Sequence, residues 1–444
     1  MKINNFIFAL FFISVLVCSC WSSKEISEEL NTTKEIFIVE KEIDLKEVKY
    51  HNQIFNNKIK SVVCKKNNLD LSLPIINLGS NDVLTIHFDD LDGDRKDYYY
   101  NIIHCNSNWE KSDLIESEYL EGFYTNSISD YEFSFNTIQK YTHYMFEFPN
   151  QNIKPKVSGN YIFQIFKENQ NVVLTKRFMV LNNKTVIKSK IRRATLADFR
   201  QTRHEIDFSI DYNNISIADP YSEITIQIKQ NNNEENIVTD LHPLFVKNQK
   251  LIYDYETENT FLGNNEFRHF DFSSLRYQSD RIREIKLDSI KNNVYLFDDH
   301  KRSFNLYSIE PDINGNFLIK TQEGWNSNTE ADYANVHFTL DMEEMSNQDV
   351  YLLGSFCDWK FKKEFKLSYN KEIQKYEAIL FLKQGYYNYQ YALFNNNRSE
   401  NINFIEGDHY QTRNDYYIYI YYKPVGSRYD QLVGFSKNSS KELF

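Results

Sequence analysis

Short runs in which apolar and polar residues alternate are the feature that most limits how this chain can fold. They recur between residues 55 and 424, and examples are VLTIHF, YIFQIF, EITIQIKQ, VHFTLDM and YYNYQYALF. Asn, Gly, Asp or Pro stands between most of them, and Asn314-Gly315 suits a tight hairpin turn. Alternation with a period of two, interrupted by polar turn residues, is typical of antiparallel sheets. The pattern therefore predicts an all-β protein.

The runs fall into three successive sets, and we expect each set to form one immunoglobulin-like β-sandwich. The expected boundaries are 55–183 for the first sandwich, 184–328 for the second and 329–424 for the third. A polar C-terminal tail over 425–444 follows the third set.

Composition agrees with strands and argues against two broad classes of protein. The chain has 32 Tyr and 34 Phe, which favour strands, and it has little Ala, so an all-α fold is not expected. The clearest helix candidate is a short segment over 109–120. The formal net charge is −11 and no strong basic run occurs, so a nucleic-acid partner is not expected either.

The N-terminus has the pattern of a bacterial lipoprotein signal. Lys2 precedes an apolar stretch over 3–17, which is shorter than the roughly 20 residues of a membrane span. The stretch ends at Val17-Cys18-Ser19-Cys20, where a small residue precedes the second cysteine as in a lipobox. We expect a signal peptide over 1–19, a lipid on Cys20 and a flexible tether to residue 54. An ordinary signal peptide with incidental cysteines is the alternative.

No motif for catalysis or cofactor binding stands out. GxSxG, HExxH, P-loop and GxGxxG patterns are all missing from the sequence. His104 and Cys105 are neighbours, but adjacent residues of a strand point to opposite faces, so we do not expect a nucleophile and its base. The acidic loop over 88–97, FDDLDGDRKD, resembles a calcium loop without its twelfth-position Glu. We expect an acidic β-turn there, and neither a metal, a cofactor nor an enzymatic activity.

Cys64, Cys105 and Cys357 are the cysteines beyond the signal region, and they are far apart. Without a CxxC pair they indicate neither a zinc site nor a dense disulfide framework. The sequence leaves two readings open, a Cys64–Cys105 disulfide and buried free thiols.

Polar and charged side chains are concentrated in the loop NNEFRHFD, at Asn264–Asp271. Glu266 and Arg268 are placed to form a charge-assisted hydrogen bond. Because the loop lacks a nucleophile, we interpret it as a buried polar bracket that holds one domain against another.

The third set contains GSFCDW, at Gly354–Trp359, followed by LKQGYYNYQY at Leu382–Tyr391. These elements resemble the early-set β-sandwich of glycogen-binding modules, in which exposed Trp and Tyr rings stack on sugars. Cys357 stands where those modules usually carry Asn. The resemblance implies a sugar-contacting Trp359, whereas the alternative makes Phe356 and Trp359 anchors within the sandwich.

Patches of distinctive sequence also occur in order along the mature chain, namely IHCNSNW (Ile103–Trp109), EYLEGF (Glu118–Phe123), SFNT (Ser134–Thr137), NNEFRHFD, LKQGYYNYQY and RYDQLVG (Arg428–Gly434). Together they resemble the plug protein family of the Bacteroidetes type IX secretion system. The resemblance implies a non-enzymatic subunit that seals the periplasmic end of the outer-membrane translocon barrel when that barrel is idle. The implied partners are the barrel and, through the lipid, the periplasmic face of the outer membrane.

Within this interpretation we expect His104 and Trp109 to hold the first sandwich together. The alternative function is an outer-membrane carbohydrate-binding lipoprotein with Trp359 in its sugar site.

Overall fold

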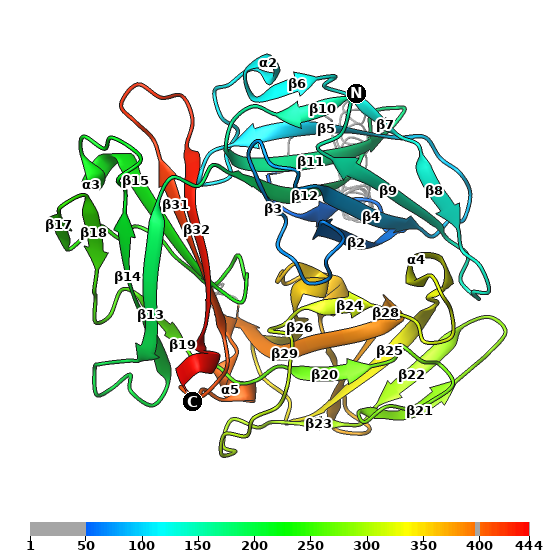
Figure 1. Ribbon diagram of the computed structural model, residues 1–444. Helices are drawn as coiled ribbons and strands as arrows, with labels where there is room; N and C mark the ends of the chain where they lie inside the picture. The colour runs from blue at the N-terminus through cyan, green and yellow to red at the C-terminus, as the bar shows by residue number, and fades with distance from the viewer. Residues whose placement is uncertain (1–49, 396–399, 444) are drawn as a thin grey trace, which may run out of the picture. The chain divides into compact units, whose positions relative to one another are not determined.

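The computed structural model describes residues 50–395 and 400–443, and nearly all of the regular structure there is β-strand (Figure 1). Each α-helix in this part is a single turn of four residues. The prediction of a mostly β protein with antiparallel sheets is confirmed. None of the helices found in these residues is long and apolar enough to cross a membrane. The expected signal peptide, Cys20 and all but the end of the tether lie outside the described residues.

Three hydrophobic cores organise the described residues, and we call the parts built around them the first, second and third lobes. In the first lobe, side chains such as Ile86 and Phe163 from two sheets meet in one core. One sheet contains β1 (Gln53–Ile54), β12 (Val172–Leu181), β11 (Gly159–Lys167), β5 (Tyr98–Cys105), β7 (Asn126–Ile128) and β3 (Ile75–Asn77). The other contains β2 (Ile59–Lys66), β4 (Leu84–Asp90), β9 (Thr142–Phe148) and β8 (Asp130–Phe133). A separate ribbon consists of β6 (Leu120–Gly122) and β10 (Ile153–Pro155).

The second lobe also has two sheets over a common core. One contains β13 (Val186–Arg193), β14 (Arg203–Asp211), β18 (Lys250–Tyr253), β17 (Phe245–Lys247) and β19 (Thr260–Leu262). The other contains β16 (Ile237–Val238), β15 (Ile224–Gln230), β31 (Asp415–Tyr422) and β32 (Gln431–Ser439), and α3 (Pro220–Glu223) leads into β15.

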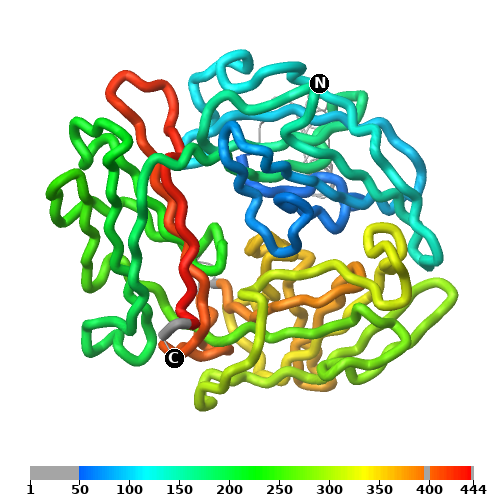
Figure 2. Tube along the Cα trace, viewed as in Figure 1, coloured from blue at the N-terminus to red at the C-terminus, as the bar shows by residue number. Residues whose placement is uncertain are grey.

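The placement of β31 and β32 differs from the domain order expected from the sequence. We expected residues 415–422 in the third sandwich and residues 425–444 in a tail. Instead β31 pairs with β15 from Ile224↔Tyr422 to Gln230↔Tyr416, and β32 pairs with β31. Figure 2 shows these C-terminal strands, in orange to red, beside the green segment of the second lobe.

Burial on both faces explains this placement of β31. Ile418 and Ile420 fill the second core, while the Tyr421 hydroxyl donates a 2.9 Å hydrogen bond to Asn160 Oδ1 of the first lobe. The alternation of Ile and Tyr predicts a strand, but it does not say which sheet takes that strand.

The third lobe is built from the segment between β19 and β31. One sheet contains β20 (Arg268–Asp271), β29 (Gly385–Asn395), β24 (Phe317–Ile319), β26 (Gln348–Leu353) and β30 (Glu400–Asn401). The other contains β21 (Ile282–Lys286), β22 (Asn292–Leu296), β25 (Tyr333–Asp341), β28 (Lys375–Lys383), β27 (Ser368–Asn370) and β23 (Asp299–His300). In β25, Val336, Phe338 and Leu340 are buried and the residues between them are half-buried, which is the period of two seen in the sequence.

Short helical turns connect these strands. They are α2 (Glu116–Tyr119), α4 (Ser327–Glu330), α5 (Asn403–Glu406), η1 (Ser355–Cys357), η2 (Lys363–Phe365) and η3 (Ser440–Leu443). Only α2 forms within the helix expected over 109–120, because Trp109 adopts a left-handed φ of 66°, Lys111 forms an antiparallel bridge with Cys105, and Ile115 is extended.

The chain crosses between the second and third lobes twice, and the two crossings lie side by side. His409 N donates to the Asn264 carbonyl at 2.8 Å, and Asn414 Nδ2 donates to the Gly263 carbonyl at 2.8 Å. A Cβ on Gly263 would lie 2.1 Å from the His409 carbonyl oxygen, so only glycine fits. Asn264 Nδ2 also donates to Gln230 Oε1 of the second lobe at 3.2 Å.

Candidate functional site

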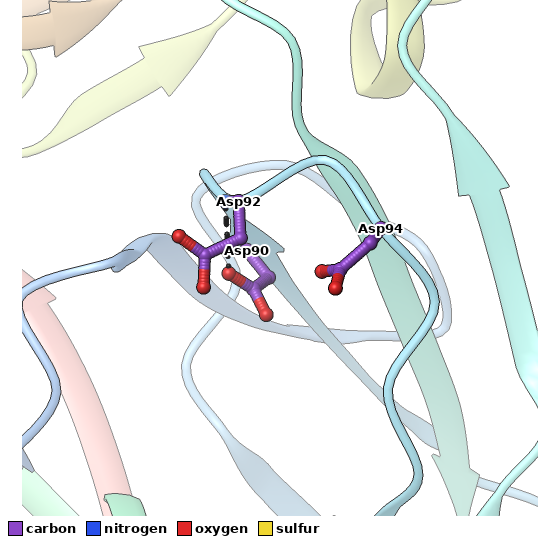
Figure 3. Close-up of side chains that lie close together, drawn as sticks. All are labelled: Asp90, Asp92 and Asp94. Atoms are coloured by element: carbon purple, nitrogen blue, oxygen red, sulfur yellow. Dashed lines mark hydrogen bonds between the residues drawn. The ribbon is translucent and has the colours of Figure 1, made fainter.

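The acidic loop at the end of β4 is neutralised in part by a lysine of the same loop, Lys96. Asp90, Asp92 and Asp94 lie together in Figure 3, with carboxylate oxygens within 4.8 Å of one another. Lys96 Nζ is 2.7 Å from Asp90 Oδ2 and 3.2 Å from Asp94 Oδ1, and it also contacts Asp92. Burial lowers the pKa of Lys96, but its carboxylate partners raise it more, so the pKa lies above its usual value. The loop is therefore a turn held together by ion pairs.

A second acidic group, in the second lobe, is also occupied by a basic side chain. Glu205, Asp207 and Asp254 gather around Arg192, whose Nε lies 2.9 Å from Asp207 Oδ2. The same guanidinium reaches Glu205 and, at 3.3 Å, Asp254. Burial raises the pKa of Asp207 to about 6. These carboxylates stabilise Arg192 at the β13–β14 pairing.

His104 and Cys105, on β5, point away from each other and do not form a catalytic pair. The His104 ring is fully buried, with Nδ1 2.8 Å from Ser112 Oγ and Nε2 3.4 Å from the Ser158 carbonyl oxygen. Burial lowers the pKa of His104 to about 4, so the ring is neutral at physiological pH. Its geometry supports the scaffold role that we expected.

All three cysteines of the described chain are buried free thiols, Cys64, Cys105 and Cys357. This decides between the two readings that the sequence left open. Burial raises the pKa of the Cys105 thiol to about 12, which makes it unreactive at neutral pH.

Trp109 lies at the boundary between the first and second lobes. Its ring is 6% exposed, and the Arg177 guanidinium stacks over it with 4.1 Å between guanidinium carbon and ring centroid. Arg177 comes from β12 and pairs with Glu234 of the second lobe at 3.1 Å. Trp109 therefore orients a cation that joins two lobes, which the sequence alone did not indicate.

Trp359 is buried at 5% exposure and has no ring face open to solvent for a sugar. Its ring packs edge-on against Phe267 at 5.8 Å, and a Cβ on Gly315 would lie 2.4 Å from it. This geometry favours the alternative in which Trp359 anchors the lobe, and it removes the observation on which carbohydrate binding rested.

The expected bond between Glu266 and Arg268 is not among the hydrogen bonds of the described residues. Arg268 instead pairs with Glu406 at 3.0 Å and with Asp299 at 2.8 Å, inside the third lobe. Glu266 accepts a 2.6 Å hydrogen bond from the Tyr307 hydroxyl, and burial raises its pKa to about 7. The guanidinium of Arg268 is therefore paired with two buried carboxylates other than Glu266. The hydrogen bond from this loop to the second lobe comes from Asn264.

The three lobes meet around a cavity of about 170 Å³ that is lined by residues of all three. Three ion pairs surround this junction, and each joins a different pair of lobes: Lys176–Asp358 at 3.3 Å, Arg177–Glu234 at 3.1 Å and Lys360–Glu235. The basic and acidic partners come from neighbouring positions of three short segments. We call this set the junction triangle.

A buried charge network joins the first and third lobes. Asp89 is fully buried, and its two oxygens lie 2.6 Å from His143 Nδ1 and 2.6 Å from Lys383 Nζ. The Tyr333 hydroxyl also donates to Asp89 at 2.7 Å, and His87 Nδ1 lies 3.1 Å from His143 Nε2. Burial alone would raise the pKa of Asp89, but Lys383 and His143 lower it by a larger amount. The net pKa lies below its usual value, so the carboxylate stays ionised.

Sequence reasoning missed the junction triangle and the Asp89 network. A signal for the second was present, since Lys383 ends the otherwise apolar run AILFL and a lysine there has to find a buried partner. Its partner is 294 positions away, so no local pattern could name it.

Comparison with known proteins gives this architecture a family. The family model described as type 9 secretion system plug protein, first domain, matches residues 59–182, which make up all of the first lobe except β1. The chain is also 33% identical to a hypothetical protein from Parabacteroides merdae of known crystal structure, over 89% of this chain and 100% of that one, with a TM-score of 0.86.

The chain belongs to the type 9 secretion system plug protein family. The resemblance expected from IHCNSNW, EYLEGF and SFNT is confirmed, and all three patches lie inside the matched residues. Membership associates the chain with the translocon of that secretion system.

Other comparisons add nothing to this assignment. No curated protein matches the chain. A trypsin-activated alpha-2-macroglobulin from Escherichia coli aligns at 8% identity over 85% of this chain and 28% of that one, with a TM-score of 0.18. A Pseudomonas fluorescens alkylpurine DNA glycosylase aligns at 14% identity over 28% and 30% of the two chains, with a TM-score of 0.15. Scores this low carry no structural argument.

Proposed function

We propose that this protein is a non-enzymatic plug that seals the periplasmic end of the type 9 translocon barrel while no substrate is passing. The observation that carries the proposal is the family match over the first lobe. We also propose that a lipid on Cys20 holds the protein at the periplasmic face of the outer membrane, as the lipobox-like sequence indicates.

The contacts between lobes suit such a role. A plug has to keep its shape against a wide opening, and the Asp89 network and the junction triangle hold the three lobes against one another. Exposed apolar side chains such as Trp325 and Phe135 offer contact area to a partner.

A reconstitution experiment tests the sealing function. The translocon barrel is inserted into liposomes loaded with a fluorescent dextran, and the mature lipidated chain is added on the side that corresponds to the periplasm. We expect the chain to reduce dextran loss and to co-purify with the barrel from the liposomes. An unrelated periplasmic β-sandwich protein of similar mass serves as the control. Equal dextran loss with both proteins would refute the proposal.

A further inference from the structure

Half of β28 has an edge without a strand partner. β27 pairs only with Lys375–Glu377, whereas β25 covers the other side of β28 along its length. Among the strands of the described residues, none lies beside the outer edge of Ala378–Lys383. An edge of this kind presents backbone N–H and C=O groups that another strand can bind.

A cavity of about 290 Å³ follows this edge. Five consecutive residues, from Ile379 to Lys383, line it. Consecutive residues of a strand point to opposite faces, so a cavity that touches all five runs along the backbone edge and not over one face. The opposite wall comes from β2, which is itself the edge strand of its sheet and faces β24 and β28 in Figure 1.

Along the β28 edge the wall of the cavity is apolar up to Lys383 and only partly covered. Ile379 is 58% exposed, and Phe381 and Leu382 are half-buried. A free strand edge beside apolar side chains is the surface by which sheets bind extended peptides, since the backbone hydrogen bonds give affinity and alternate side chains enter pockets.

The charges around this cavity leave one cation without a partner. Lys60 pairs with Glu364 across the two walls at 3.8 Å, and Lys383 pairs with Asp89. Lys362 also lines the cavity, and no ion pair of the described residues includes it. In a chain of net charge −11, this locally uncompensated lysine is complementary to an acidic side chain on the occupant.

The space continues beyond the edge of β28. The cavity at the junction of the three lobes shares Val62, Phe317, Ser355 and Asp358 with it, so the two adjoin. An occupant that pairs with β28 therefore has room to extend towards the junction triangle.

We propose that the outer edge of β28 binds an extended segment of a partner protein as an added strand. Alternate apolar side chains of that segment fill the cavity against Ile379 and Phe381, and one acidic side chain pairs with Lys362. This interaction is separate from sealing, because it requires only a polypeptide in extended form.

Two experiments test this proposal: selection of peptides that bind the chain, and removal of backbone hydrogen-bond donors from the selected peptide. A phage-displayed library of random seven-residue peptides is selected on the full mature chain, and the strongest binder is synthesised. We expect selected sequences to alternate apolar residues and to include Asp or Glu. N-methylation of alternate amides in the synthetic peptide should weaken binding by about tenfold or more, because it removes the ladder hydrogen bonds. Hydrogen exchange should slow at Ala378–Lys383.

Matched variants separate the β28 edge from other surfaces. Ile379→Arg should weaken binding by about tenfold, whereas Ile373→Arg, which changes a 46% exposed residue in the turn before β28, should not. Lys362→Glu should weaken binding of the acidic peptide and strengthen binding of a peptide in which the acidic residue is replaced by lysine.

Four results would each overturn the proposal. The first is that no peptide is enriched, and the second is that the N-methylated peptide binds as tightly as the unmodified one. The third is that the peptide slows hydrogen exchange only outside β28, and the fourth is that exchange in β28 slows at high protein concentration without any peptide. Each of them leaves the sealing experiment unaffected, so the two proposals fail independently.

Discussion

At the residue scale, buried polar side chains with specific partners organise this protein. His104, Lys96 and Asp89 lie in three different surroundings, and each has its charge state set by neighbours that the fold supplies. The sequence predicts a structural His104, because adjacent strand residues face opposite sides, and in the structure the ring is buried and hydrogen-bonded to Ser112. It could not predict the exposure of Trp359, since the same GSFCDW pattern serves a sugar site or a packed anchor.

The lowered pKa of His104 predicts a pH-dependent stability. An unfolded histidine binds a proton near pH 6.5, whereas burial holds the folded pKa at about 4. Between these values the unfolded state binds more protons, so the stabilising contribution is present above pH 6.5 and is lost as the pH falls towards 4. The loss amounts to about 3 kcal/mol over this window.

Urea denaturation of the wild type and of His104→Gln, at a series of pH values from 7 to 4, measures this effect. The free energy of unfolding should fall less with acid in His104→Gln, by about 3 kcal/mol. His300→Gln, at an exposed histidine, is the control. Parallel pH profiles for wild type and His104→Gln would show that the ring does not titrate differently on folding.

At the element scale, β31 shows where local pattern stops being informative. The alternation in its run YYIYIYY predicts a strand, which the structure shows, yet its partner β15 lies far back in the sequence. The third lobe is inserted between them, and a strand that is buried on both faces fits either lobe by composition. Its pairing with β15, in which Ile418 lies opposite Ile228, puts it in the second core.

Truncation of Ile418 tests this assignment. Ile418→Ala should destabilise the protein by about 3 kcal/mol, because the side chain is fully buried in the second core. Hydrogen exchange should speed up in β14, which shares that core, before it does so in β28. Lys437→Gln, at an exposed residue of β32, is the control and should change neither. Faster exchange in β28 with β14 unchanged would place β31 in the third lobe.

At the scale of the whole molecule, the lobes are joined by charges as well as by chain crossings. Lys383 donates across the boundary to Asp89, while the junction triangle connects each pair of lobes once. Removing one member of a buried pair leaves the other charge uncompensated, which costs more than the pair contributes.

Lys383→Met should therefore destabilise the contact between the first and third lobes by about 3–5 kcal/mol. We expect the urea transition to move to lower concentration and to split, because the lobes then unfold less cooperatively. Lys375→Met on the same strand removes a partly exposed pair with Asp298 and should have a much smaller effect. Equal transitions for both variants would argue against a structural role for the Asp89 network.

Local sequence was enough to predict the β class of this protein, the position of many of its strands and, through ordered patches such as IHCNSNW, its family. These are properties of local alternation and of short motifs, which a linear reading contains. The tertiary structure decided which sheet takes β31, that Trp359 is covered, that Arg268 pairs with Glu406, and that Asp89 meets Lys383. Each of these depends on contacts between residues that are distant in sequence and meet only in the folded protein. A local sequence pattern does not specify which distant residue will be the partner.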